Sequence, residues 1–206
     1  MVMLAGSLVV ARPARAQDSP RADPPSHNNA VADTAAFLAG GAAAFGMHEG
    51  GHLLFDVIFD AQPHLAPVRY GPVPFFAITP TRALSPRQLF VVASAGLWTQ
   101  QISSEWLQPA HRDLRHEHAP FAKGMLAFDV LTSIGYATVA FTETGPAQRD
   151  TRGIAVGASV SERTIGVLVL APAVLEAYRY FKPNSVWARW AIRAVEAGSF
   201  MLIIKG

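Results

Sequence analysis

Four long apolar stretches alternate along the chain with shorter polar segments. They cover residues 34–59, 89–107, 124–141 and 164–181. Each is close to the ~20 residues that an α-helix needs to cross the hydrocarbon core of a bilayer. All four also contain polar residues, which is typical of membrane helices that face one another inside a bundle. The pattern therefore predicts a bundle of about four transmembrane helices.

Two other segments complete the expected fold. Residues 187–204 carry Arg189, Arg193 and Glu196 at three- and four-residue spacing, which predicts a C-terminal helix at the rim of the bundle or at the membrane surface. Residues 61–87 hold six prolines, and the part at 73–79 favours strands or a re-entrant loop over a helix. We therefore expect an all-α membrane protein with a short Pro-rich strand pair or re-entrant loop.

Composition supports a membrane location. Half of the residues are hydrophobic, 16% are charged and the mean hydropathy is +0.23, whereas soluble domains average about 25% charged residues. A net charge of +2 without a dense basic patch argues against a nucleic-acid partner. The expected surroundings are a lipid bilayer, and in particular the bacterial inner membrane.

The first 33 residues are expected to lie outside the membrane domain. Residues 1–11 form an apolar run too short to span a bilayer, and Ala14-Arg15-Ala16 fits the small-x-small cleavage pattern. This indicates a signal peptide at 1–16, with an uncleaved first membrane helix as the alternative. Residues 17–33 are expected to be a flexible polar tether, and residues 34–206 the transmembrane domain.

The first apolar stretch contains the most reactive set of side chains in the chain, His48-Glu49-Gly50-Gly51-His52. On a helix, positions i and i+4 share one face, so both imidazoles can reach one zinc ion at roughly 2.0–2.1 Å. Glu49 lies near the same rim, where it can take a proton from a zinc-activated water. Because the chain has no cysteine, any further ligand must be His, Asp or Glu.

A catalytic zinc usually has three protein ligands and one open position. The best third candidate is Asp129, the only acid in the middle of the third apolar stretch, because a carboxylate at that depth needs a partner. Glu105, near the end of the second stretch, is the first rival. Asp56 ranks lower, because a straight helix does not easily bring positions i, i+4 and i+8 to one ion. A cluster of three histidines reads as a solvated loop of mixed charge: His111, His116 and His118.

These residues resemble the site-2 protease family of intramembrane zinc metallopeptidases, over roughly residues 37–136. The His-Glu-Gly-Gly-His motif at 48–52 matches the family's metal motif, and Gly-Pro-Val-Pro at 71–74 resembles the segment that commonly follows. Ser-Ala-Gly-Leu at 94–97 is similar to the family's Ala-Gly-Pro motif on the next helix. Asp129 stands where the family's Asp ligand is expected. The resemblance implies a zinc peptidase that acts on a membrane protein or peptide substrate.

The expected activity is therefore peptide-bond hydrolysis in or beside the bilayer. Zinc would be held by two histidines and Asp129, with Glu49 as the general base. Gln100 or Gln101 would hydrogen-bond the developing oxyanion or the substrate backbone, and the Pro-rich segment would receive an unwound substrate strand. The alternatives are a non-catalytic zinc-binding membrane protein that acts as an interaction or assembly module, and a soluble zinc peptidase with a buried helix bundle.

Overall fold

The computed structural model describes residues 30–70 and 73–205. The expected signal peptide at 1–16 and most of the expected tether lie outside these residues. The last part of that tether, residues 30–33, belongs to the first helix, which begins at Ala30.

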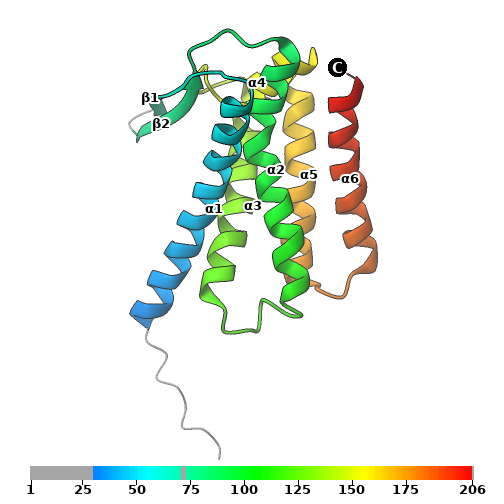
Figure 1. The fold of residues 1–206 in the computed structure, drawn as a ribbon. Coiled ribbons are helices and arrows are strands. Elements are labelled where there is room, and N and C mark those ends of the chain that lie inside the picture. Colours follow the sequence, from blue (N-terminus) through cyan, green and yellow to red (C-terminus); the bar gives the residue numbers. More distant parts are fainter. Residues whose placement is uncertain (1–29, 71–72, 206) are drawn as a thin grey trace, which may run out of the picture.

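The described chain folds into a bundle of long helices with a small hairpin at one end (Figure 1). The long helices are α1 (Ala30–Ile58), α2 (Pro86–Ala110), α3 (Pro120–Thr142), α5 (Glu162–Phe181) and α6 (Val186–Lys205). Between α3 and α5 lies the short helix α4 (Asp150–Ala158). Strands β1 (Pro63–Tyr70) and β2 (Val73–Pro80) pair antiparallel, in a register that runs from Pro63 opposite Pro80 to Tyr70 opposite Val73.

Figure 1 places the hairpin and α4 at the same end of the bundle. The α2–α3 and α5–α6 connections lie at the opposite end, which is also where α1 begins. Segments that are far apart in the sequence therefore share one end of the bundle: the hairpin and α4 at one end, and the α2–α3 and α5–α6 connections at the other.

The predominantly helical fold and the Pro-rich strand pair are confirmed. Within the described residues, three helices are long and apolar enough to cross a membrane, namely α1, α3 and α5. The α2 helix is not among them, so the expected number of four transmembrane helices is not confirmed. The C-terminal helix at 187–204 is present as α6.

Local sequence signals explain where several helices begin. The Ser85 hydroxyl accepts a hydrogen bond from the backbone N–H of Gln88, and the Gln88 side chain accepts one from the backbone N–H of Ser85. This reciprocal pair is a capping box, and Pro86 follows at the first helical position of α2. Ser161 caps α5 through the backbone N–H of Thr164.

Glycines allow α1 and α3 to pack backbone against backbone. A Cβ atom added at Gly40 would collide with the backbone of Phe121, and one added at Gly124 would collide with the backbone of Phe37. Small residues at helix crossings are typical of membrane bundles, because they permit close van der Waals contact without a hydrophobic driving force. This close approach fixes α3 beside the helix that carries the His-Glu-Gly-Gly-His motif.

Candidate metal centre

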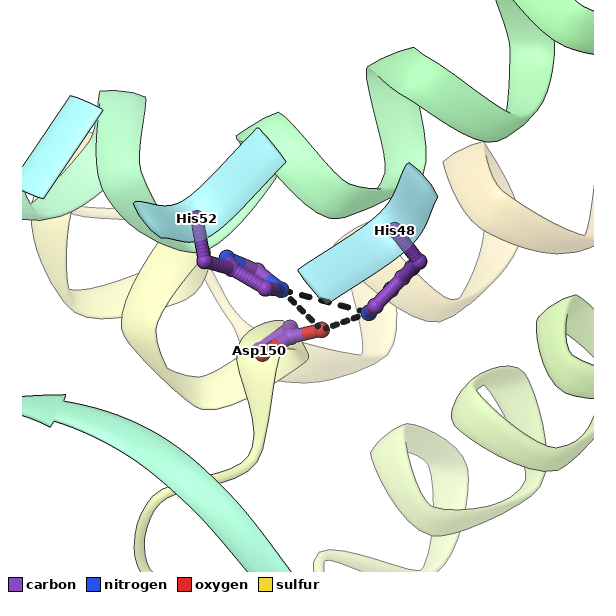
Figure 2. Close-up of side chains that lie close together, drawn as sticks. All are labelled: His48, His52 and Asp150. Carbon is purple, nitrogen blue, oxygen red and sulfur yellow. Dashed lines mark hydrogen bonds and ion pairs between the residues drawn. The ribbon is translucent and has the colours of Figure 1, made fainter. Parts of the chain in front are cut away.

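His48 and His52 lie on one face of α1 and point toward the first residue of α4, Asp150 (Figure 2). The Nε2 atoms of the two imidazoles are 3.2 Å apart. The Oδ2 atom of Asp150 lies 3.2 Å from Nε2 of His48 and 3.3 Å from Nε2 of His52. Among the described residues, these three form the one cluster of His, Asp and Glu side chains arranged closely enough to hold a metal ion.

The size of this triangle matches a tetrahedral metal site. Nitrogen and oxygen ligands about 2.0–2.1 Å from one zinc ion, at tetrahedral angles, lie about 3.3–3.4 Å from one another. The three observed separations of 3.2–3.3 Å fall at that edge length. Both histidines are also buried, at 2% and 6% exposure, so their lone pairs have little access to bulk water.

Hydrogen bonds at the far side of each ring fix the imidazoles in the orientation that a metal requires. The Nδ1 of His52 lies 2.7 Å from the carbonyl oxygen of Val92, and the Nδ1 of His48 lies 3.0 Å from Oε1 of Gln100. Both partners are acceptors, so Nδ1 of each ring carries a proton, and Nε2 is the atom that faces Asp150 and would bind a metal in its deprotonated form. Metal-bound histidines in proteins usually have such an acceptor behind them.

The start of α4 is held in place by an ion pair that brackets Asp150. Arg149 donates from Nε and Nη2 to the two carboxylate oxygens of Glu162, at 2.6 and 2.7 Å. The Thr151 hydroxyl donates to the same carboxylate at 2.7 Å. Arg149 and Glu162 are at most 10% exposed, so the pair is shielded and bidentate, which favours a single geometry. The two neighbours of Asp150 are therefore anchored to α5.

The histidines also keep Asp150 ionised. Burial by itself would raise the pKa of the Asp150 carboxyl, but the charge of His52 and hydrogen bonds from both imidazoles outweigh burial and hold the pKa well below its usual range. A metal ligand must be the carboxylate form, so the electrostatics of the group suit a cation.

A cavity of about 410 Å³ opens at this group. Glu49 and Tyr136 line it together with His52 and Asp150. The Tyr136 hydroxyl lies 3.3 Å from Nε2 of His48, and its ring stacks on that imidazole at 5.7 Å between centroids. The cavity therefore combines two of the three potential ligands with a carboxylate and a phenol, the two kinds of group that hydrolysis of an acyl bond needs.

The hairpin forms the opposite wall of the cavity. Residues 76–78 of β2 and Val68 of β1 line it. Among the described residues, no third strand pairs with the two-stranded sheet. One edge of β2 is thus unpaired among the described residues, and residues 76–78 of this strand lie beside the candidate metal centre.

The structure brings His48, Glu49 and His52 together as expected, but the carboxylate beside the two imidazoles is Asp150 rather than Asp129. Asp129 is buried elsewhere along α3, where its Oδ2 accepts hydrogen bonds from the hydroxyls of Ser103 and Ser104 at 3.3 and 3.0 Å. The two serines supply partners for one oxygen of the buried carboxylate, while its Oδ1 has no hydrogen-bond partner among the described residues.

The rivals for the third ligand position have other surroundings. Glu105 forms ion pairs with Arg179 and Arg193 of α5 and α6. Asp56 is fully buried one turn beyond His52 on α1, outside the three-residue group. The loop histidines pair with nearby acids, as His111 does with Glu117 at 2.6 Å. The solvated-loop interpretation of that cluster agrees with these contacts.

Neither Gln100 nor Gln101 of α2 lines the cavity at the metal group. Gln100 is 3% exposed and hydrogen-bonds to Nδ1 of His48. In this structure it therefore orients the His48 imidazole and does not contact the space open to a substrate. Gln101 lines a separate, smaller cavity between α2 and α5. The expected contact of these two residues with substrate therefore has no support from their positions.

The sequence did not predict two residues of the site, Asp150 and Tyr136, and only Tyr136 could have been found from the sequence pattern. Asp150 lies in the polar segment between two apolar stretches, where a carboxylate is usually solvated, so nothing marked it. Tyr136 lies seven residues after Asp129 and thus on the same face of α3. The choice of Asp129 therefore identified the correct face of α3. Its position along the helix axis is about 10 Å from that of Tyr136, because seven residues separate them and each adds about 1.5 Å.

Comparison of the chain with protein-family models, with curated proteins and with solved structures gives no match. The functional argument therefore depends on the geometry of the site.

Proposed function

We propose that this chain is a membrane-embedded zinc metalloprotease that hydrolyses peptide bonds in or near the bilayer. The observation that carries the proposal is the triangle of two buried histidines, His48 and His52, with the partly buried Asp150; its edges of 3.2–3.3 Å fit a tetrahedral ion, and it opens on a cavity lined by Glu49. The resemblance of the His-Glu-Gly-Gly-His motif to the site-2 protease family points to the same activity.

The chemistry divides between the metal and the side chains of the cavity. A bound zinc supplies a Lewis acid that lowers the pKa of water to about 7 and polarises a carbonyl. Glu49 accepts the proton of the attacking water and delivers it to the leaving amine. Tyr136, which lies against His48 at the cavity wall, donates a hydrogen bond to the oxyanion of the tetrahedral intermediate.

The hairpin gives a route for presenting substrate. A peptide bond in a helix is poorly accessible, because its amide groups are already paired, so the substrate must be extended at the point of cleavage. The free edge of β2 can pair with an extended backbone by strand addition. Since residues 76–78 line the same cavity as Glu49 and His52, a strand bound there would run past the metal centre.

A matched set of variants tests the proposal. The purified full chain, in detergent, is assayed for zinc by elemental mass spectrometry and for cleavage of a panel of fluorogenic transmembrane peptides. We expect one zinc per chain in the parent, loss of zinc in His48→Ala, and retained zinc with a 10²–10⁴-fold lower cleavage rate in Glu49→Gln, as is typical when a general base is removed.

Glu143→Gln is the control for the Glu49 variant, since Glu143 lies at the end of α3 and pairs with Arg163 at the surface. It should retain both zinc and cleavage. A parent that binds one zinc and cleaves none of the peptides would favour a non-catalytic zinc-binding membrane protein. Zinc retained after His48→Ala would show that the metal, if bound, lies elsewhere.

A further inference from the structure

A second cavity is lined by residues in and next to the α2–α3 and α5–α6 connections. These two connections lie at the end of the bundle opposite the hairpin and α4 (Figure 1). Its volume is about 460 Å³. Four arginines and one histidine contribute to its lining and no acidic residue does; the basic residues are His111, Arg112, Arg179, Arg189 and Arg193. Such a lining selects for a negatively charged ligand.

Pairing within the protein neutralises only part of this charge. Arg179 and Arg193 share the carboxylate of Glu105, and Glu196 lies close enough to both arginines to interact with them. His111 is paired with Glu117, as noted above. Arg112 and Arg189 are the remaining cations of the lining, and no carboxylate in the part of the chain described here forms an ion pair with either.

Two buried donors at the cavity also lack acceptors. The Nε of Arg179 and the Nε2 of Gln108 are buried and have no hydrogen-bond partner among the described residues, and both side chains line the cavity. Arg179 is only 4% exposed. Buried N–H groups are rarely left without an acceptor, because desolvation is costly. Phosphate oxygens are acceptors that suit a guanidinium, which binds them in a fork geometry.

Exposed aromatic residues place this end of the bundle at a membrane–water interface. Trp106 near the end of α2 is 75% exposed, and Trp187 and Trp190 at the start of α6 are 59% and 65% exposed. Tyr178 and Phe181, at the end of α5, are also exposed. Tryptophan and tyrosine gather at the level of lipid head groups, where an amphipathic ring meets both water and hydrocarbon. Residues close to these aromatics in sequence line the cavity, namely Gln108, Tyr180 and Arg189, so in a membrane it would lie near the head groups.

We propose that this cavity binds the phosphate of an anionic phospholipid, with Arg112 and Arg189 as its free cations and Arg179 and Gln108 as buried donors. Basic pockets between membrane helices hold acidic head groups by the same means. The acyl chains of the lipid would lie against the exposed rings of α5 and α6. The inference depends on the membrane location of the bundle and is independent of proteolysis.

The test counts lipids bound to the full chain by native mass spectrometry from detergent micelles. The chain is titrated with dioleoyl phosphatidylglycerol, with zwitterionic dioleoyl phosphatidylcholine, and with inorganic phosphate as a competitor. We expect phosphatidylglycerol to bind at least tenfold more tightly than phosphatidylcholine, and at least tenfold more weakly to the Arg112→Gln/Arg189→Gln double variant than to the parent.

The charge-matched control is the Arg82→Gln/Arg163→Gln double variant. Both arginines are exposed and pair with surface acids, Asp60 and Glu143. This variant should bind phosphatidylglycerol as the parent does, and unchanged circular dichroism in both double variants would show that they are folded. Equal binding of the two lipids, or an equal loss in both double variants, would overturn the proposal. Displacement of the lipid by inorganic phosphate at matched concentration would also overturn it, because the ligand would then be a soluble phosphate compound.

Discussion

At the scale of single residues, the candidate metal centre depends on how each ligand atom is aimed. His48 and His52 turn their Nε2 atoms toward Asp150 because Gln100 and the Val92 carbonyl hold the opposite ring nitrogens. The position of Asp150 is fixed by its neighbours Arg149 and Thr151, which both donate hydrogen bonds to Glu162. A metal ion would bind the carboxylate and both rings at once, in place of the protons that link the imidazoles to Asp150 here.

Substitution of each aspartate separates the structural assignment of the third ligand from the sequence-based one. Asp150→Asn removes the ionised oxygen beside the two imidazoles, so zinc affinity should fall by at least 100-fold. Asp129→Asn should lower it by less than tenfold, because Asp129 bonds to Ser103 and Ser104. Competition with a chromophoric chelator measures both affinities. The opposite order of the two variants would restore Asp129 as the ligand.

Gln100, the hydrogen-bond acceptor for Nδ1 of His48, should also affect metal affinity. In Gln100→Ala, His48 loses the group that fixes its tautomer and ring orientation, and loss of such a partner typically costs 10- to 100-fold in metal affinity. Gln101→Ala is the matched control, since Gln101 faces a different cavity, and it should leave zinc affinity unchanged. The same chelator competition checks this pair. Equal effects of both variants would contradict the role assigned to Gln100.

At the scale of elements, the site exists because α2 approaches α1 at glycine positions. A Cβ atom added at Gly51 would lie 2.7 Å from the carbonyl oxygen of Ala95 on α2. One added at Gly96 would lie 2.7 Å from Nε2 of His48. Gly51 and Gly96 are therefore explained by one crossing, in which the α2 backbone passes directly against the metal-binding face.

Adjacent glycines of α1 give a controlled test of this crossing. Gly51→Ala forces the α2 backbone to move, since a carbonyl group cannot yield as a side chain does, and overpacking of this kind costs about 1–3 kcal/mol. At Gly50, no atom lies within 4 Å of an added Cβ, so Gly50→Ala should stabilise by up to about 1 kcal/mol through helix propensity. Thermal unfolding in detergent, followed by circular dichroism, should show opposite shifts. Equal shifts would mean that α1 and α2 do not cross at Gly51.

At the scale of the whole molecule, the apolar surface of α1 indicates what surrounds the bundle. Large hydrophobic side chains along this helix are exposed, including Leu38 at 63%, Leu54 at 57% and Val57 at 64%. Together with the length and hydropathy of α1, α3 and α5, this favours lipid contact, because a contiguous exposed apolar face is unfavourable in water. The hairpin and α4 lie at one end of the bundle, and the α2–α3 and α5–α6 connections, whose residues line the basic cavity, lie at the other (Figure 1).

Membrane integration can be measured directly. Cells that express the full chain are lysed, and their membranes are washed with alkaline carbonate without detergent. We expect the chain to stay with the pelleted membranes, because removal of three apolar helices from the bilayer exposes their whole surface to water. A chain recovered mainly in the carbonate supernatant would support a soluble zinc peptidase with a buried helix bundle.

The sequence by itself determined the parts of this protein that depend on short-range order. The spacing of His48 and His52 places both imidazoles on one helical face whatever surrounds the helix, because i and i+4 are one turn apart. Hydropathy located the long helices, and the prolines between 63 and 80 excluded a helix there. Lengths and periodicities are local properties, so they can be read without knowing which elements touch.

Tertiary structure alone decided which carboxylate meets the two histidines. Asp129 and Asp150 both follow α1 by many residues, and their separation in sequence gives no information about depth along the bundle. The depth is set by the backbone contacts of Gly40 and Gly124 and by the ion pair that anchors α4 to α5. The same packing turned Gln100 toward His48 instead of substrate, because a buried amide in a bundle bonds to whichever partner the neighbouring helices bring within reach.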